Sequence, residues 1–145
     1  PREAMAVYRF TEGNIHLELF WKDKDALRSP EALWLGIRPE VENPSCWQMV
    51  KSGAALSPSN VVSNGNRQLH VVQDLSYTGS DSRIHITPTD APLVSLGGKK
   101  LYQPDNSMPE LSQGFFFLLY NNRWGTNFKQ WFEEDMRFAF DISLS

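Results

Sequence analysis

The stretch Ile15-His16-Leu17-Glu18-Leu19-Phe20-Trp21 decides the fold of this chain. Its odd positions are all apolar, and they share one face of an extended strand because strand side chains alternate between two faces. Residues 136–142 repeat the pattern, with apolar side chains at every even position. These two stretches predict strands that each bury one face.

Shorter alternating or apolar stretches predict further strands, at residues 5–10, 33–37, 46–50, 69–73, 83–87, 92–96 and 100–103. The stretch Gly114–Asn121 is apolar on both faces, which is typical of a central strand with a layer on each side. Asn64-Gly65 predicts a hairpin after Val61-Val62, and Gly97-Gly98 predicts a second hairpin that residues 99–102 complete. Seven or more short strands with such turns predict an all-β chain folded as a β-sandwich.

Only residues 128–135 favour a helix. Phe128, Trp131 and Phe132 fall at helical spacing, behind a Thr-Asn pair that can cap a helix. The segment is short, so we expect at most one short helical turn there.

Composition describes one globular domain over residues 1–145. The chain is 41% hydrophobic and 21% charged, and a chain of this length buries roughly two thirds of its unfolded surface without disulfides or metal. Its net charge is −3, which disfavours nucleic acid as a partner because phosphate binding needs a basic stripe. The longest apolar run, residues 115–120, is too short to cross a membrane. The single cysteine, Cys46, leaves no intrachain disulfide.

Candidate catalytic and metal-binding residues are sparse. His16 and Glu18 share the polar face of one strand, where His70 or His85 could supply a third metal ligand. An ordinary solvated sheet face explains the same pattern more simply. The acidic residues 133–135 are adjacent in sequence, whereas a glycosidase acid and base face each other across a gap. We therefore predict no catalytic residue, no metal ligand and no cofactor in this chain.

The segment Tyr120–Trp131 departs most from ordinary composition. It holds two tryptophans, three asparagines, a glutamine, a threonine and an arginine. Aromatic faces pack against pyranose rings while amides and arginine hydrogen-bond their hydroxyl groups, so the segment has the chemistry of a sugar site. The candidate substrate-binding residues are Trp124, Asn127, Arg123, Trp131 and Asn122. The alternative, which the pattern alone favours, is a structural corner whose asparagines satisfy turn backbone.

The same segment carries a family resemblance. The block Leu119-Tyr120-Asn121-Asn122-Arg123-Trp124-Gly125-Thr126-Asn127-Phe128, followed by Trp131 and the acidic residues 133–135, is similar to the C-terminal end of large proteins resembling family 38 glycoside hydrolases. Those proteins are relatives of the retaining α-mannosidases. Looser matches extend the resemblance over most of the chain from near Pro30, at residues 30–35, 57–65, 69–70 and 89–94.

The resemblance implies a role beside a catalytic domain. In the α-mannosidase relatives, zinc and the nucleophilic aspartate belong to an N-terminal α/β barrel, and C-terminal β-sandwiches brace that barrel and lend residues to the rim of its substrate pocket. This sequence holds no zinc-binding or nucleophile motif of such a barrel, so any zinc would belong to the parent's catalytic domain.

Two functions follow as expectations. In the first, residues 1–145 are the C-terminal part of a longer protein: a non-catalytic β-sandwich, galactose-mutarotase-like or similar, whose partners are the catalytic domain and its glycan. The alternative is a free-standing carbohydrate-binding module or lectin-like domain that uses the same aromatic and amide residues.

Overall fold

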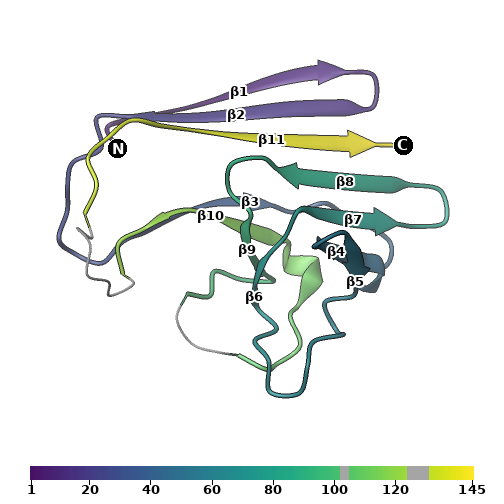
Figure 1. The fold of residues 1–145 in the computed structure, drawn as a ribbon. Coiled ribbons are helices and arrows are strands. Elements are labelled where there is room, and N and C mark those ends of the chain that lie inside the picture. The colour runs from purple at the N-terminus through teal and green to yellow at the C-terminus, as the bar shows by residue number, and fades with distance from the viewer. Residues whose placement is uncertain (102–104, 124–130) are drawn as a thin grey trace.

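The computed structural model describes residues 1–101, 105–123 and 131–145 of the chain. Two antiparallel sheets make up the fold, as Figure 1 shows. The larger sheet has the strand order β1 (Glu3–Thr11), β2 (Asn14–Lys22), β11 (Met136–Leu144), β8 (Arg83–Pro88), β7 (Asp74–Thr78), β4 (Trp47–Lys51) and β5 (Ala54–Leu56). The smaller sheet has the order β3 (Ala32–Ile37), β10 (Phe115–Asn121), β9 (Leu93–Leu96) and β6 (Leu69–Val71). Two short 3-10 turns, η1 (Pro44–Cys46) and η2 (Leu111–Gln113), complete the described elements.

The strands predicted from residues 15–21 and 136–142 lie side by side in the larger sheet. Phe138 is paired with Leu19 and Phe140 with Leu17, so their apolar faces are continuous across the two strands. These faces point toward the smaller sheet, and Phe140 is completely buried. The all-β, sandwich-like fold that the alternation predicts is confirmed.

Aromatic rings fill the space between the two sheets. The rings of Trp47 and Phe115 meet edge to face with centroids 4.7 Å apart, and those of Phe117 and Phe140 do so at 5.2 Å. Each of these contacts joins a strand of the larger sheet to β10, which occupies a central position in the smaller sheet. Burying one such ring contributes roughly 1.5–3 kcal/mol, so β10 is a main determinant of the packing.

The two predicted glycine hairpins are wrong. Asn64 does adopt a left-handed conformation with φ 62° and the Gly65 N–H closes a turn onto Val62, but residues 61–62 form no strand. The Arg67 guanidinium instead donates a 2.5 Å hydrogen bond to the carbonyl of Ser59 in the same loop. The side chain of Val62 is 78% exposed, and residues 61–62 belong to neither sheet.

At Gly97-Gly98 the chain turns without forming the second strand of a hairpin: residues 99–101 are not extended in a sheet, and residues 102–103 lie outside the described part. The Ser95 hydroxyl holds the turn by donating to the Gly98 carbonyl and accepting from the Lys100 N–H. Gly97 has φ 69°, and a Cβ there would lie 2.7 Å from the Glu110 carbonyl oxygen, so only glycine fits.

Two strands were not predicted. β7 alternates Leu75 and Tyr77, both buried, with polar residues, but its five residues carry the pattern only briefly. β5 is exposed throughout, so it has no hydrophobic alternation to detect. Its hairpin with β4 instead depends on Ser52 and Gly53, which adopt φ values of 50° and 80°, as a tight two-residue turn requires.

Candidate functional site

The structure describes part of the predicted sugar-binding segment. Asn122, Arg123 and Trp131 lie within the described residues, and Trp124 and Asn127 lie outside them. The described flanks meet at one end of the sandwich, where β10 ends and where residues 131–135 lead into β11. Residues 131–135 form no helix, and residues 128–130 of the predicted helical turn lie outside the described part.

Asn122 uses its whole amide on the protein's own backbone. Its side-chain Nδ2 donates to the carbonyls of Leu27 and Ser29, each at 2.9 Å, and its Oδ1 accepts from the Glu31 N–H at 2.7 Å. The residue is only 8% exposed. These three bonds attach the loop before β3 to the end of β10, which is what the structural-corner alternative predicts for an asparagine in this segment.

Lys24 is the second anchor of this corner. Its side chain is 1% exposed, and its ammonium lies 2.5 Å from Glu31 Oε1 and 3.1 Å from the carbonyl oxygens of Asp25 and Phe132. The same ammonium lies 4.5 Å from the centre of the Tyr120 ring. A buried ammonium is costly unless it is paired and hydrogen-bonded, and here both conditions hold.

Trp131 and Arg123 are less enclosed. The Arg28 guanidinium lies 4.8 Å from the centre of the Trp131 ring, close enough for a cation–π contact. Arg123 is exposed, and its backbone N–H donates to Asn121 Oδ1 at 3.3 Å. The structure therefore brings Asn122, Arg123 and Trp131 to one end of the sandwich, with Asn122 inside the fold and the other two nearer the surface.

A second polar cluster lies on the outer face of the larger sheet. His16 and Glu18 of β2 alternate with core residues, so they point away from the smaller sheet. The register pairs His16 with Arg9 on one side and with Asp141 on the other. Strands far apart in sequence thus place charged side chains in one row across the sheet.

Glu18 is held between two arginines. Arg9 lies 2.7 Å from one carboxylate oxygen, and the Arg137 guanidinium donates two hydrogen bonds to the other. The hydrogen bonds from Arg137 lower the pKa of Glu18 most, and the charge of Arg9 lowers it further, against the opposing effect of burial. Glu18 therefore stays ionised at neutral pH and fixes the position of both arginines.

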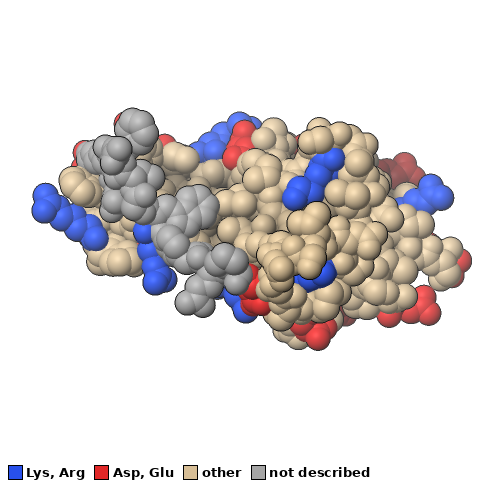
Figure 2. All heavy atoms as spheres, turned by 60° about the horizontal axis from the view of Figure 1, so that its bottom comes forward, with Lys and Arg blue, Asp and Glu red and all other residues tan. Residues whose placement is uncertain are grey.

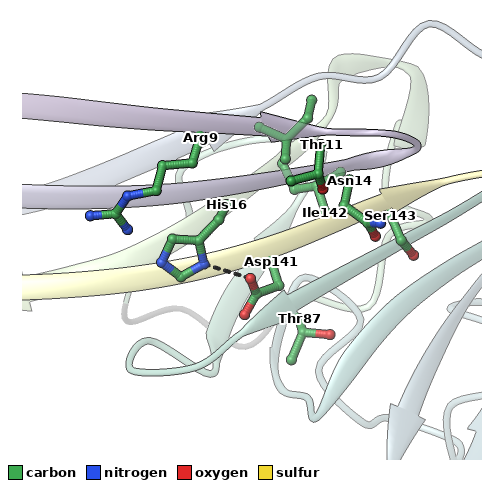
Figure 3. Close-up of a pocket in the computed structure, with 9 residues that line it drawn as sticks. Arg9, Thr11, Asn14, His16, Thr87, Asp141, Ile142 and Ser143 are labelled. Atoms are coloured by element: carbon green, nitrogen blue, oxygen red, sulfur yellow. Dashed lines mark hydrogen bonds and ion pairs between the residues drawn. The ribbon is translucent and has the colours of Figure 1, made fainter.

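His16 and Asp141 border a hollow beside this carboxylate. His16 Nδ1 lies 2.6 Å from Asp141 Oδ1, and His16 Nε2 lies 3.9 Å from Glu18 Oε1. The hollow has a volume of about 570 Å³, within the range of small-molecule sites. Figure 3 shows His16 turned toward Asp141, with Arg9 on one side and Thr87 on the other. Its polar lining also includes the side chains of Thr11, Asn14 and Ser143.

The hollow offers hydrogen bonds without a net charge. Arg9 and Arg137 balance Glu18 and Asp141, so the row of charges attracts neither an anion nor a cation strongly. The side chains of Arg9 and Asp141 are 61% and 59% exposed, which leaves part of each accessible to a ligand. This combination of donors, acceptors and hydroxyl groups fits a neutral ligand with many hydroxyl groups.

The histidines weighed as a third metal ligand do not join His16 and Glu18. His70 lies in β6 of the smaller sheet and is buried, while His85 is paired with Ser143 two positions along β11 from Asp141. Within residues 1–101, 105–123 and 131–145, no three histidine, cysteine, aspartate or glutamate side chains gather as a metal site would require.

Sequence reasoning missed the outer-face hollow and the Lys24 anchor. The polar residues of 15–21 and 136–142 were visible as one face of each strand, but their strand register was not, so His16 could not be placed beside Asp141. Lys24 carries no signal at all in sequence, because nothing local distinguishes a buried lysine from an exposed one.

No protein-family model, no curated protein and no solved structure matches the chain. In the part of the chain that the structure describes, no helix has the length and apolar character needed to span a membrane. On the face shown in Figure 2, the described lysines and arginines lie singly among acidic and uncharged residues.

Proposed function

We propose that the chain is a non-catalytic β-sandwich domain of a glycoside hydrolase family 38-like protein, where it supports the catalytic barrel and contacts glycan. The hollow beside His16 and Asp141, whose lining includes Ile15 and Ile142 besides its polar side chains, carries the glycan part of this proposal. Saccharides are neutral and rich in hydroxyl groups, and the hollow combines balanced charge with exposed donors and acceptors.

The supporting role rests on different residues. The segment that resembles the family has both flanks tied to one end of the sandwich, by Asn122 on one side and by the Lys24 contact with Phe132 on the other. Both described flanks of the segment are therefore attached to the same end of the domain. A domain that contributes residues to the rim of a neighbouring pocket needs such fixed flanks.

Saccharide binding by the purified chain tests the glycan contact. The purified chain is titrated with a panel of mannose-containing oligosaccharides, and binding is followed by NMR chemical shifts. We expect shift changes at residues around the hollow, with dissociation constants in about the millimolar range. Asp141→Ala should weaken binding about tenfold because it removes an accessible acceptor. The matched control is Asp81→Ala, in the turn between β7 and β8, which should bind as the wild type does.

Three other outcomes of the experiment are informative. Binding that Trp131→Ala abolishes and Asp141→Ala leaves unchanged would move the glycan contact to the aromatic segment. Binding with a dissociation constant of about 1 μM or below, tight enough to act without a catalytic partner, would favour the free-standing carbohydrate-binding module. Turnover of a 4-nitrophenyl α-mannoside by the purified chain, with or without added zinc, would overturn the non-catalytic assignment.

A further inference from the structure

β1 forms a long edge of the larger sheet, and β2 is its only partner among the described strands. It lies at one end of the strand order, and its nine residues contrast with the three of β5 at the opposite edge. Three of its large apolar side chains are more than half exposed: Met5 at 55%, Tyr8 at 54% and Phe10 at 71%. A long apolar edge strand is a template for pairing with another strand.

The register identifies which backbone groups face outward. The Gly13 carbonyl accepts from Leu144 N–H of β11, so the odd residues of β2 direct their backbone groups to β11 and the even residues direct theirs to β1. The β1–β2 register pairs each even residue of β2 with an odd residue of β1. The even residues of β1, centred on Ala6, therefore present their N–H and C=O groups to the open edge.

We propose that β1 pairs antiparallel with β1 of a second copy of this chain, with Ala6 opposite Ala6 of that copy. This register joins the outward backbone groups of both strands and keeps each side chain on its own face of the extended sheet. It places Glu3 opposite Arg9 of the second copy, and Arg9 opposite the second copy's Glu3. Two antiparallel copies of β1 therefore place opposite charges against each other at both ends of the pairing.

Side-chain sizes fit the same register. On the outer face Met5 lies opposite Val7 of the second copy, which makes an apolar pair between the two charged pairs. On the other face the exposed ring of Tyr8 lies opposite the small side chain of Ala4 of the second copy. Shifting the pairing by two residues places Glu3 opposite Val7 or Thr11 and loses both charged pairs. The register with Ala6 opposite Ala6 therefore pairs the outward backbone groups, places opposite charges together and matches the sizes of the facing side chains.

The oligomeric state in solution tests this interface. We expect the wild-type chain, 16.6 kDa as a monomer, to form a dimer as its concentration rises in analytical ultracentrifugation. Glu3→Arg and Arg9→Glu should each raise the dimer dissociation constant by about tenfold, because each places like charges opposite one another twice. An equimolar mixture of the two variants should restore the dimer, since both charged pairs then form between unlike chains. Glu12→Arg, the same charge change outside the paired residues, should leave the constant unchanged.

Ala6→Pro provides a test that does not depend on charge. It removes the outward N–H at the centre of the pairing, and an edge strand tolerates proline where its N–H faces outward. We expect a folded monomer, with thermal unfolding followed by circular dichroism as the check on folding. A chain that stays monomeric up to about 1 mM, or a dimer that neither Glu3→Arg nor Ala6→Pro weakens, would overturn the proposal.

Discussion

Two polar regions of the molecule use hydrogen bonds in opposite ways. At the corner where β10 ends, Lys24 and Asn122 make their hydrogen bonds with carbonyl, carboxylate and N–H groups of the same chain, and both residues are buried. On the outer face of the larger sheet, Arg9 and Asp141 are more than half exposed and keep part of their surface for solvent. The first region stabilises the fold, and the second has capacity left to bind a ligand.

The difference follows from the cost of burying polar groups. A buried donor or acceptor that loses its partner costs about 1–3 kcal/mol, whereas an exposed one exchanges its partner for water at little cost. Substitutions in the corner should therefore change stability, and substitutions in the hollow should change binding. Substitutions at Lys24, Asn122 and His70 test this separation.

Lys24→Met should give the largest loss of stability. It leaves Glu31 without its ammonium partner and two backbone carbonyls without their donor, and breaking such a buried pair costs about 3–5 kcal/mol. The free energy of unfolding from urea denaturation measures the effect. Lys22→Met, on an exposed lysine two residues earlier, is the control and should change stability by less than about 0.5 kcal/mol. Equal effects of the two substitutions would show that the corner is not an anchor.

Asn122→Ala should destabilise the fold by about 3 kcal/mol. The substitution leaves two carbonyls and one N–H of residues 27–31 without their present partners. Thermal unfolding checks the loss, with Asn106→Ala on an exposed asparagine as the comparison. A stable Asn122→Ala variant with weakened saccharide binding would instead assign Asn122 to a ligand and remove the contrast between the two regions.

His70 lies between these two cases, because it is buried but not satisfied. It is 6% exposed, and of the described buried side-chain nitrogens and oxygens its Nε2 is the one without a hydrogen-bond partner. Burial lowers the pKa of His70 most, the nearby charge of Lys51 lowers it further, and the backbone of Arg67 acts against them. The folded protein therefore resists protonating this ring.

This histidine should make the fold sensitive to mild acid. Well above pH 6.5 the ring is neutral in both states. As the pH falls through 6.5 the unfolded chain takes up a proton first, because the pKa of His70 is lower in the folded protein, so the free energy of unfolding falls. The loss is at most about 1.4 kcal/mol for each pH unit, until the folded state is protonated as well. Urea denaturation of the wild type and of His70→Leu between pH 5 and pH 8 measures how the free energy of unfolding depends on pH. His70→Leu should flatten this dependence. His85→Gln, on an exposed histidine, is the control and should preserve it. If His70→Leu leaves the pH dependence of the free energy of unfolding unchanged, His70 is not its cause.

The sequence predicted the layers of the fold better than its site. Period-two alternation identified β2 and β11 because each buries a complete face, and turn residues marked most of the remaining breaks. The hairpin prediction at Asn64-Gly65 was wrong because a turn residue sets only the local backbone conformation and does not determine whether the flanking residues pair in a sheet. The hollow beside His16 was out of reach, since it depends on the pairing of strands more than a hundred residues apart, and no local pattern encodes that register.

The place of β11 has a consequence for how the protein is made. Although it follows all other described strands in the chain, it is inserted between β2 and β8 in the middle of the larger sheet. During synthesis the β1–β2 hairpin can form early, but the edge of β2 stays unpaired until β11, more than a hundred residues later in the chain, leaves the ribosome. Until then the larger sheet consists of two separate halves, and the nascent chain carries two additional open edges that the finished protein lacks.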